Sequence, residues 1–272
     1  MGADFVVPAN RSALERLYAK YNRRELVTPD PLELLYKFDD PADCEPAALL
    51  VSTLAYGKVA HILRSAAAIL NGMGSPGRFL KRATRGSLRR YLAGFRHRFT
   101  RGEELAALLW GAREVIGTYG SLQACFAAGL NDDDETVAPA IEAFVMRLTA
   151  RAAYLRKFVL PQPGKGSACK RLNLFLRWMV RRDDVDTGLW DRVPRARLIV
   201  PLDTHMHRIC RILGLTARRQ ADLRTAMEIT AAFRAVSPDD PVRYDFALTR
   251  LGIREGGELE WFLRDYGLPG AA

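Results

Sequence analysis

Lys170 and Asp203 are the residues best placed to do chemistry in this sequence. Asp203 follows an apolar stretch that ends in Pro201 and Leu202, and a helical pattern starts directly after it, so we expect Asp203 at a helix N-cap. The first amides and the dipole of a helix stabilise a carboxylate there. Lys170 begins another expected helix, whose dipole disfavours an ammonium and favours the nucleophilic amine. The structural alternatives are a capping aspartate and a solvated lysine.

A turn rich in proline and glycine precedes Lys170 and is expected to be a tight connection between two helices. It consists of Pro163, Gly164, Lys165, Gly166 and Ser167. Glycines let a backbone approach another surface, and the free amides at the start of the next helix bind phosphate. With the added charges of Lys165 and Arg171, the turn and the helix start could bind the phosphate backbone of a nucleic acid without sequence specificity. An ordinary helical corner is the alternative.

The charge balance also favours a polyanionic partner. Lys and Arg number 41 against 31 Asp and Glu, a net charge of +10, which favours nucleic acid through counterion release. An arginine-rich proteome is the alternative explanation. One basic region carries three aromatic residues, expected mostly in the core, among cations expected mostly on solvated faces: Lys81, Arg82, Arg85, Arg89, Arg90, Arg96, Arg98 and Arg101, with Tyr91, Phe95 and Phe99.

Helical periodicity runs through nearly the whole chain, so the expected fold class is all-α. No stretch alternates long enough to predict a sheet. A connecting region near the start is punctuated by Pro29, Pro31, Pro41 and Pro46. An acidic turn at residues 131–134 is expected to cap the helix after it. Helices are expected over residues 14–21, 47–54, 59–70, 86–92, 103–116, 121–128, 135–158, 170–179, 203–213, 217–236 and 241–251.

Together, the turn and the Asp203 segment resemble the helix-hairpin-helix (HhH-GPD) superfamily of DNA glycosylases. The shared order is helix, Pro/Gly turn, helix, and then an apolar-Pro-apolar-Asp sequence at a helix start. Val200-Pro201-Leu202-Asp203-Thr204-His205-Met206 is similar to the eukaryotic-type 8-oxoguanine glycosylases, and Asp-Thr-His also resembles endonuclease III. The match extends over residues 163–215, with a looser one over 48–62, about a quarter of the chain. It is specific to the superfamily and not to the damaged base.

The resemblance implies a lysine nucleophile, for which this chain has two candidates. A gapless overlay of the turn puts Ala168 where bifunctional members place the lysine, a departure from their pattern. Lys170 lies two residues further on, and residues 169–172 resemble the variant found in archaeal GO glycosylases. The separation of 33 positions between Lys170 and Asp203 also resembles that type. We therefore favour Lys170, with Lys165 as the competing candidate.

The activity that the resemblance implies is base-excision repair by a DNA glycosylase with AP lyase activity, a hydrolase and lyase in one. The first base to expect is 8-oxoguanine, with Lys170 attacking C1′ and Asp203 stabilising the charge that develops there. Implied DNA contacts are the turn, Arg171, and His205 at a phosphate. Tyr56 and Lys58 would lie in a loop that fills the gap left by the extruded base. The structural alternatives are a packed ring for Tyr56 and a surface or capping role for His205.

Other functions remain open at this point. The chain could be a monofunctional glycosylase for another lesion, such as an alkylated base, or a non-catalytic DNA- or RNA-binding protein of the same fold. A helical protein–protein scaffold is a further alternative, and it would lack the steep salt dependence of phosphate contacts. Four large aromatic residues fit a base pocket or the core equally well: Phe175, Trp178, Tyr244 and Phe246.

The resemblance also implies two helical subdomains with a cleft between them. Residues 47–182 would form the middle subdomain, which ends in the helix-hairpin-helix motif. Residues 1–46 and 183–272 would form the other, which carries Asp203. The expected partner is double-stranded DNA containing a damaged base, bound by a monomer.

The sequence predicts neither a metal cluster nor a membrane segment. Its cysteines are far apart and form no C-x-x-C pair, so we expect buried reduced thiols, no zinc and no iron–sulfur cluster. The resemblance does allow a monovalent cation on carbonyls of the turn. The start lacks a signal-peptide pattern and no apolar run reaches ~18 residues, so we expect a cytoplasmic, nucleoid-associated protein. The four cysteines are Cys44, Cys125, Cys169 and Cys210.

Overall fold

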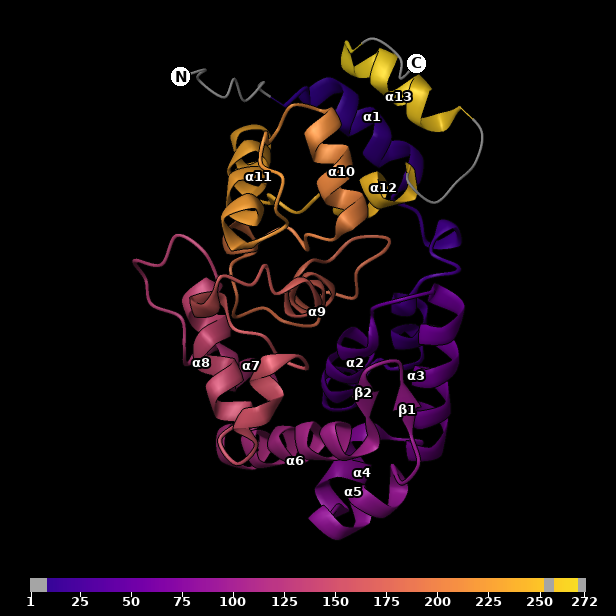
Figure 1. Ribbon diagram of the computed structural model, residues 1–272, viewed down its shortest axis with the longest axis vertical. Helices are drawn as coiled ribbons and strands as arrows, with labels where there is room; N and C mark the ends of the chain where they lie inside the picture. The colour runs from indigo at the N-terminus through magenta and orange to yellow at the C-terminus, as the bar shows by residue number, and fades with distance from the viewer. Residues whose placement is uncertain (1–8, 252–256, 269–272) are drawn as a thin grey trace.

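The chain folds mostly into helices, as its periodicity predicts, in a computed structural model that describes residues 9–251 and 257–268 (Figure 1). Residues 1–8, on which the expected absence of a signal peptide rests, lie outside this part. The α-helices are α1 (Arg11–Tyr21), α2 (Pro41–Leu54), α3 (Val59–Met73), α4 (Pro76–Arg82), α5 (Arg85–Tyr91), α6 (Gly102–Tyr119), α7 (Leu122–Ala127), α8 (Ala138–Leu148), α9 (Lys170–Val180), α10 (Thr204–Ile212), α11 (Leu223–Val236), α12 (Asp245–Leu251) and α13 (Glu258–Tyr266). Shorter 3₁₀ turns are η1 (Arg24–Leu26), η2 (Pro31–Lys37), η3 (Ala153–Lys157), η4 (Pro163–Lys165) and η5 (Arg195–Arg197).

Helix α2 lies at the centre of the lower part of the molecule in Figure 1, where it packs on α3, α4, α6 and α9. Every residue from Cys44 to Leu54 is buried, as expected for a helix that is mostly apolar on all sides. Pro46 lies inside α2, so its predicted place in a connecting region is wrong. Burial on every side of the helix outweighs the cost of one proline.

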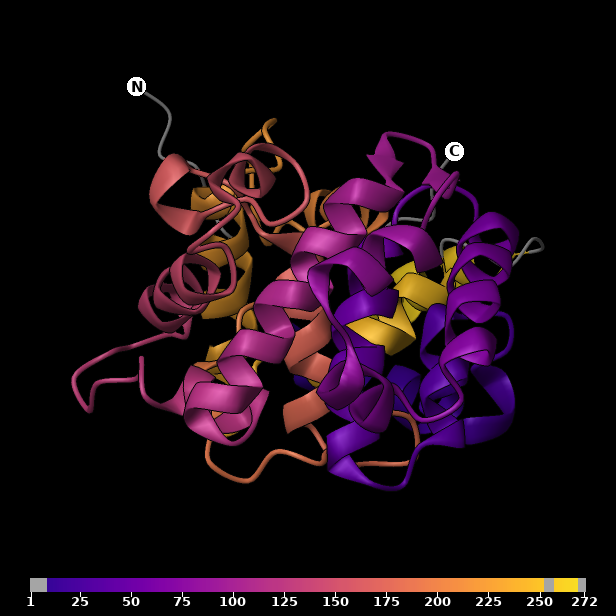
Figure 2. The same ribbon diagram turned by 90° about the horizontal axis from the view of Figure 1, so that it is seen from below.

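The upper part brings the first helix together with the last ones. Helix α1 packs on α12 and α13, and α10 packs on α12 (Figure 1). Helix α9 lies between this layer and α2, and Figure 2 shows α4 to α6 at the opposite end, nearest the viewer. The predicted division at residue 46 falls inside α2, whereas the one at residue 182 falls just after α9. No helix within residues 9–251 and 257–268 is long and apolar enough to cross a membrane.

The single helix expected over residues 135–158 is wrong. Helix α8 begins at Ala138 with Val137 as its N-cap, so the acidic turn does not cap it, and it ends at Leu148. A proline in the first turn fixes where α8 starts, since proline fits there and not in a helix interior. Helices α11 and α12 also begin later than expected, and the side chain of Asp222 caps α11 by accepting from the Thr225 amide.

Two short strands also depart from the expectation of no sheet. Strands β1 (Arg96–His97) and β2 (Thr100–Arg101) pair in antiparallel fashion, with His97 opposite Thr100. The two residues between the strands form the turn, and Arg98 adopts a positive φ of 51° there. Two residues per strand are too few to show an alternating pattern, which is why the sequence does not predict this hairpin.

Candidate active site

Asp203 caps α10 and at the same time contacts Lys170. Its Oδ1 accepts hydrogen bonds from the amides of His205 and Met206, both at 2.9 Å, which confirms the expected N-cap. Its Oδ2 lies 3.4 Å from Nζ of Lys170, the first residue of α9. The two residues that the sequence singles out therefore meet, although 33 positions separate them.

A backbone carbonyl completes the surroundings of the amine. Lys170 Nζ donates to the carbonyl oxygen of Ala55 at 3.3 Å, directly after α2 ends. The side chains of Lys170 and Asp203 are 31% and 25% exposed, so both are held by the protein and open to solvent. An amine next to a carboxylate, accessible from outside, has the arrangement of a nucleophile and its general base. Sequence reasoning missed Ala55, because a carbonyl leaves no trace in residue type.

The Pro/Gly turn is held by helices on both sides of it. The Gly164 amide donates to Glu142 of α8 at 3.0 Å, and the Gly166 carbonyl accepts from the Leu223 amide of α11 at 2.9 Å. Gly164, Lys165 and Gly166 are exposed, and Gly166 has a φ of 81°, a conformation that glycine adopts without strain.

The tight helix–turn–helix expected here is wrong in its first half. Helix α8 ends at Leu148, and residues 149–169 connect it to α9 through η3 and η4. Prolines and glycines near the turn disfavour a continuous helix. The Gln162 and Pro163 carbonyls accept the amides of Lys165 and Gly166, and Gly166 accepts from Leu223. These three carbonyls already accept amides of the protein, and the monovalent cation at the turn stays a prediction of the resemblance.

Lys165 does not join the Lys170–Asp203 pair. It is exposed, and within the described residues no carboxylate lies at ion-pair distance from it. Lys58, the N-cap of α3, and His205 are exposed as well, whereas Ser167 is half-buried and its hydroxyl accepts from the Cys169 amide at 3.1 Å. The geometry therefore favours Lys170 over Lys165 as the amine beside Asp203.

Arg171 and Tyr56 make their contacts within the protein. The Arg171 guanidinium donates to the carbonyls of Thr53, at 3.0 Å, and Phe158, and burial lowers the pKa of Arg171. The Tyr56 hydroxyl donates to the His97 carbonyl at 2.7 Å and accepts from the Thr100 amide at 3.0 Å. The packed-ring alternative thus describes what Tyr56 does in this structure.

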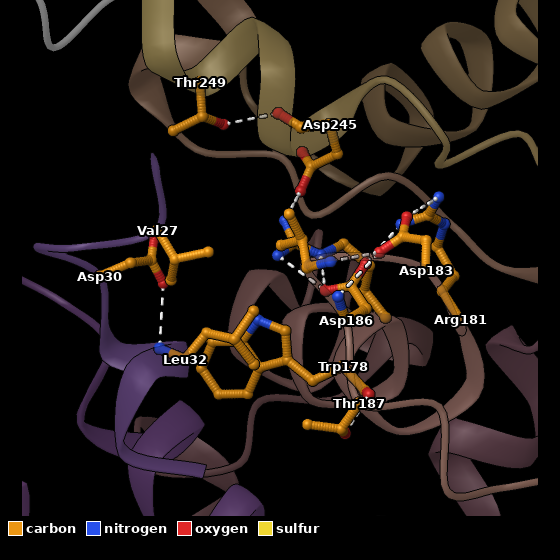
Figure 3. Close-up of polar contacts among 12 residues, drawn as sticks. Val27, Asp30, Leu32, Trp178, Arg181, Asp183, Asp186, Thr187, Asp245 and Thr249 are labelled. Carbon is orange, nitrogen blue, oxygen red and sulfur yellow. Dashed lines mark hydrogen bonds and ion pairs between the residues drawn. The ribbon is translucent and has the colours of Figure 1, made fainter. Parts of the chain in front are cut away.

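A buried charge cluster holds the other end of α9. Arg177 and Arg181 are each 3% exposed; Arg177 pairs with Asp186 and Asp245, and Arg181 pairs with Asp186, Asp183 and Asp240. Figure 3 shows Asp183 and Asp186 beside Arg181, with Asp245 of α12 directed toward them. Burial raises the pKa of Asp245, and the Arg177 charge opposes that shift. Because α12 also packs on α10, this cluster fixes α9 relative to the helix that Asp203 caps.

The remaining candidate side chains, four aromatic residues and four cysteines, are buried. All four aromatic residues that fitted a pocket or the core are buried: Phe175, Trp178, Tyr244 and Phe246. The four cysteines are buried and free, as expected. Among residues 9–251 and 257–268, no group of His, Cys, Asp and Glu side chains could hold a metal ion.

Comparison with known proteins gives one match. The family described as "Protein of unknown function (DUF2400)" matches residues 30–254, most of the chain. No curated protein and no solved structure matches.

Proposed function

This chain belongs to the DUF2400 family, whose function is unknown, and from the geometry of its site we propose that it is a DNA glycosylase with AP lyase activity that acts in base-excision repair. The observation that carries the proposal is the 3.4 Å contact between Lys170 Nζ and Asp203 Oδ2, at the first turns of two helices and open to solvent. It supports the two roles that the sequence resemblance implies for these residues.

The proposed reaction begins with proton transfer from the Lys170 ammonium to Asp203, which frees the amine. The amine attacks C1′ of the extruded nucleotide; the Nζ–C1′ bond forms, the glycosidic bond breaks, and the base leaves with the bonding electron pair and takes up a proton. That proton comes from Asp203, whose restored carboxylate then stabilises the positive charge that develops at C1′. The new secondary ammonium gives one proton to O4′ as the ring opens. The sugar ring then opens to a Schiff base, and loss of a C2′ proton expels the 3′ phosphate. Water releases the lysine at the end.

Several features favour duplex DNA as the substrate. The net charge is +10, and Lys58, Lys165 and His205 are exposed. Lys165 lies shortly before Lys170 in the sequence, and His205 lies two residues after Asp203. Gly166 of the turn is exposed with open space beside it, so a phosphate could approach the backbone there, whereas the Gly164 amide already donates to Glu142. The choice of 8-oxoguanine as the first base rests on the resemblance of residues 200–206. We further propose that the protein acts as a monomer on the nucleoid.

Excision assays on lesion-containing duplexes test this function. We expect the wild type to release the base from a duplex that carries 8-oxoguanine or an alkylated base, to cleave the strand at an abasic site, and to leave a duplex without a lesion intact. Asp203→Asn should lose most excision while still binding DNA, because asparagine caps helices but carries no charge. Asp222→Asn is the matched control, since Asp222 caps α11 in the same way. No excision from any duplex by the wild type would contradict the proposal.

The same panel distinguishes the proposed bifunctional enzyme from a monofunctional glycosylase. A monofunctional glycosylase would release the base and leave the strand intact until alkali is added, with Lys170→Gln as active as the wild type. The bifunctional enzyme that we propose would cleave the strand without alkali.

A further inference from the structure

An exposed phenylalanine stands at the tip of the β1–β2 hairpin. Phe99 is 67% exposed, the highest value among the large apolar side chains exposed in residues 9–251 and 257–268. The sequence predicts mostly buried aromatics in this region, so Phe99 departs from that expectation. A single exposed apolar side chain is common on protein surfaces, so a role for Phe99 has to come from what surrounds it.

The backbone under Phe99 is firmly held. The Tyr56 hydroxyl binds the hairpin from both sides, at the His97 carbonyl and the Thr100 amide. The His97 ring is buried and lies 3.1 Å from the Tyr56 carbonyl through Nε2 and 3.0 Å from the Ser65 hydroxyl through Nδ1. Because the hairpin is anchored on both strands, the exposure of Phe99 is a feature of the fold.

The hairpin is connected to the Lys170–Asp203 pair through neighbouring residues. Tyr56, which anchors it, directly follows Ala55, whose carbonyl accepts from Lys170. On the other side, the Phe99 ring meets Phe158 edge to face with centroids 5.9 Å apart. Phe158 in turn lies 4.8 Å from the guanidinium of Arg171, the residue after Lys170. Two independent chains of contacts thus connect Phe99 to the candidate active site.

Arginines lie both beside the phenyl ring and at the base of the hairpin. The Arg98 guanidinium lies 5.6 Å from the Phe99 ring centre, and the exposed Arg96 and Arg101 face each other at the base of the hairpin. Both line a cavity of about 720 Å³ whose wall also holds Glu103 and Glu114 and three further arginines: Arg85, Arg89 and Arg151. An aromatic ring among arginines suits a nucleic-acid strand, whose bases stack on rings while its phosphates bind cations.

We propose that Phe99 inserts into the base stack next to the nucleotide that is drawn toward Lys170. Arg96, Arg98 and Arg101 bind the flanking phosphates. The inference rests on the proposed function and assigns the gap-filling task to Phe99, with Tyr56 as a positioning residue that holds the hairpin. Stacking of the phenyl ring offsets part of the cost of unstacking the target base.

Fluorescence of 2-aminopurine tests this role. The probe base is placed beside an abasic site in a duplex, and binding is followed for the wild type, Phe99→Ala and Phe99→Trp. We expect Phe99→Ala to lose most of the fluorescence change and to bind roughly 5-fold or more weakly, and Phe99→Trp to retain both. Trp261→Ala is the control, because Trp261 is also exposed (39%) but lies on α13. Equal thermal midpoints of the variants verify that they fold.

The outcomes distinguish this inference from the proposed function. If the wild type excises a base and Phe99→Ala gives the same fluorescence change and affinity, the role of Phe99 is wrong and the proposed function stands. If the wild type neither binds nor cleaves any of the duplexes, both are wrong.

Discussion

The two carboxylate oxygens of Asp203 have different partners, so one residue can both cap a helix and serve the proposed reaction. Oδ1 accepts the amides of His205 and Met206, so the side chain is held in one orientation. Oδ2 is thereby directed at Lys170 Nζ, 3.4 Å away. A reactive group held by the helix that it caps needs little reorganisation during catalysis.

At the same scale, we predict that His97 makes the protein less stable as the solution becomes acidic. Burial lowers the pKa of His97 below its ordinary value of 6.5, since an imidazolium would lose its hydration. The ring also fits its neutral form, with Nε2–H donating to the Tyr56 carbonyl and Nδ1 accepting from Ser65. The stability tied to the neutral ring is complete above pH 6.5 and is lost as pH falls from there through the lower pKa of the folded state.

Urea unfolding at pH 7.5, 6.5 and 5.5 measures this effect. We expect the free energy of unfolding to fall more across this range for the wild type than for His97→Gln, which keeps a donor and an acceptor but does not titrate. Parallel curves for the two proteins would show that His97 does not carry the pH dependence.

The sequence could predict the position of a residue where that position depends on neighbouring residues, and not where it depends on contacts between distant parts of the chain. Asp203 and Lys170 were placed correctly at helix starts, because capping and helical periodicity depend on a few neighbouring residues. The hydrogen bonds of Tyr56 join positions more than 40 residues apart, and no local pattern reveals them. The exposure of Phe99 depends on that same contact, so the sequence could not predict it.

At the scale of elements, the close approach of α6 and α8 depends on one glycine. A Cβ on Gly111 would come within 1.9 Å of the Leu148 carbonyl oxygen, a backbone atom that cannot turn away. We therefore predict that Gly111→Ala lowers the free energy of unfolding by about 2 kcal/mol or more.

Gly117 of the same helix provides the matched control. It is exposed, and a Cβ there would meet no atom within 4 Å, so Gly117→Ala should stabilise the protein by roughly 0.5–1 kcal/mol. Chemical unfolding of both variants gives the comparison. A neutral or stabilising Gly111→Ala would show that the two helices do not pack as closely as described.

This contact also explains an error in the sequence-based elements. Residues 135–158 show one helical period, yet α8 ends at Leu148, where its carbonyl meets α6. Helix α8 thus ends where it packs on α6, and periodicity does not report such a tertiary contact. Helices α6 and α10 lie close to their predicted ranges, and local residues mark their ends: Gly120 is the C-cap of α6 and Asp203 is the N-cap of α10.

At the scale of the whole molecule, the buried charges of α9 connect the layer of α10 and α12 with the helices below it. Removing one partner of a buried ion pair leaves the other charge without compensation. We predict that Arg177→Met lowers the free energy of unfolding by about 3–5 kcal/mol, since Asp186 and Asp245 would remain buried.

Arg264→Met serves as the comparison for that variant. Arg264 is exposed and pairs with Glu260 at 3.9 Å, so its loss should leave stability nearly unchanged. Thermal or urea unfolding of the two variants measures the difference. If Arg177→Met is as stable as Arg264→Met, the cluster does not hold α9 in place.

Borohydride trapping of the protein on a duplex containing 8-oxoguanine tests the central claim most directly. The account predicts a covalent protein–DNA adduct with the wild type and with Lys165→Gln, and none with Lys170→Gln, because Lys170 and not Lys165 is the candidate lysine beside Asp203. An adduct that persists in Lys170→Gln, or no adduct with any protein on either an 8-oxoguanine or an abasic duplex, would contradict Schiff-base chemistry at this lysine.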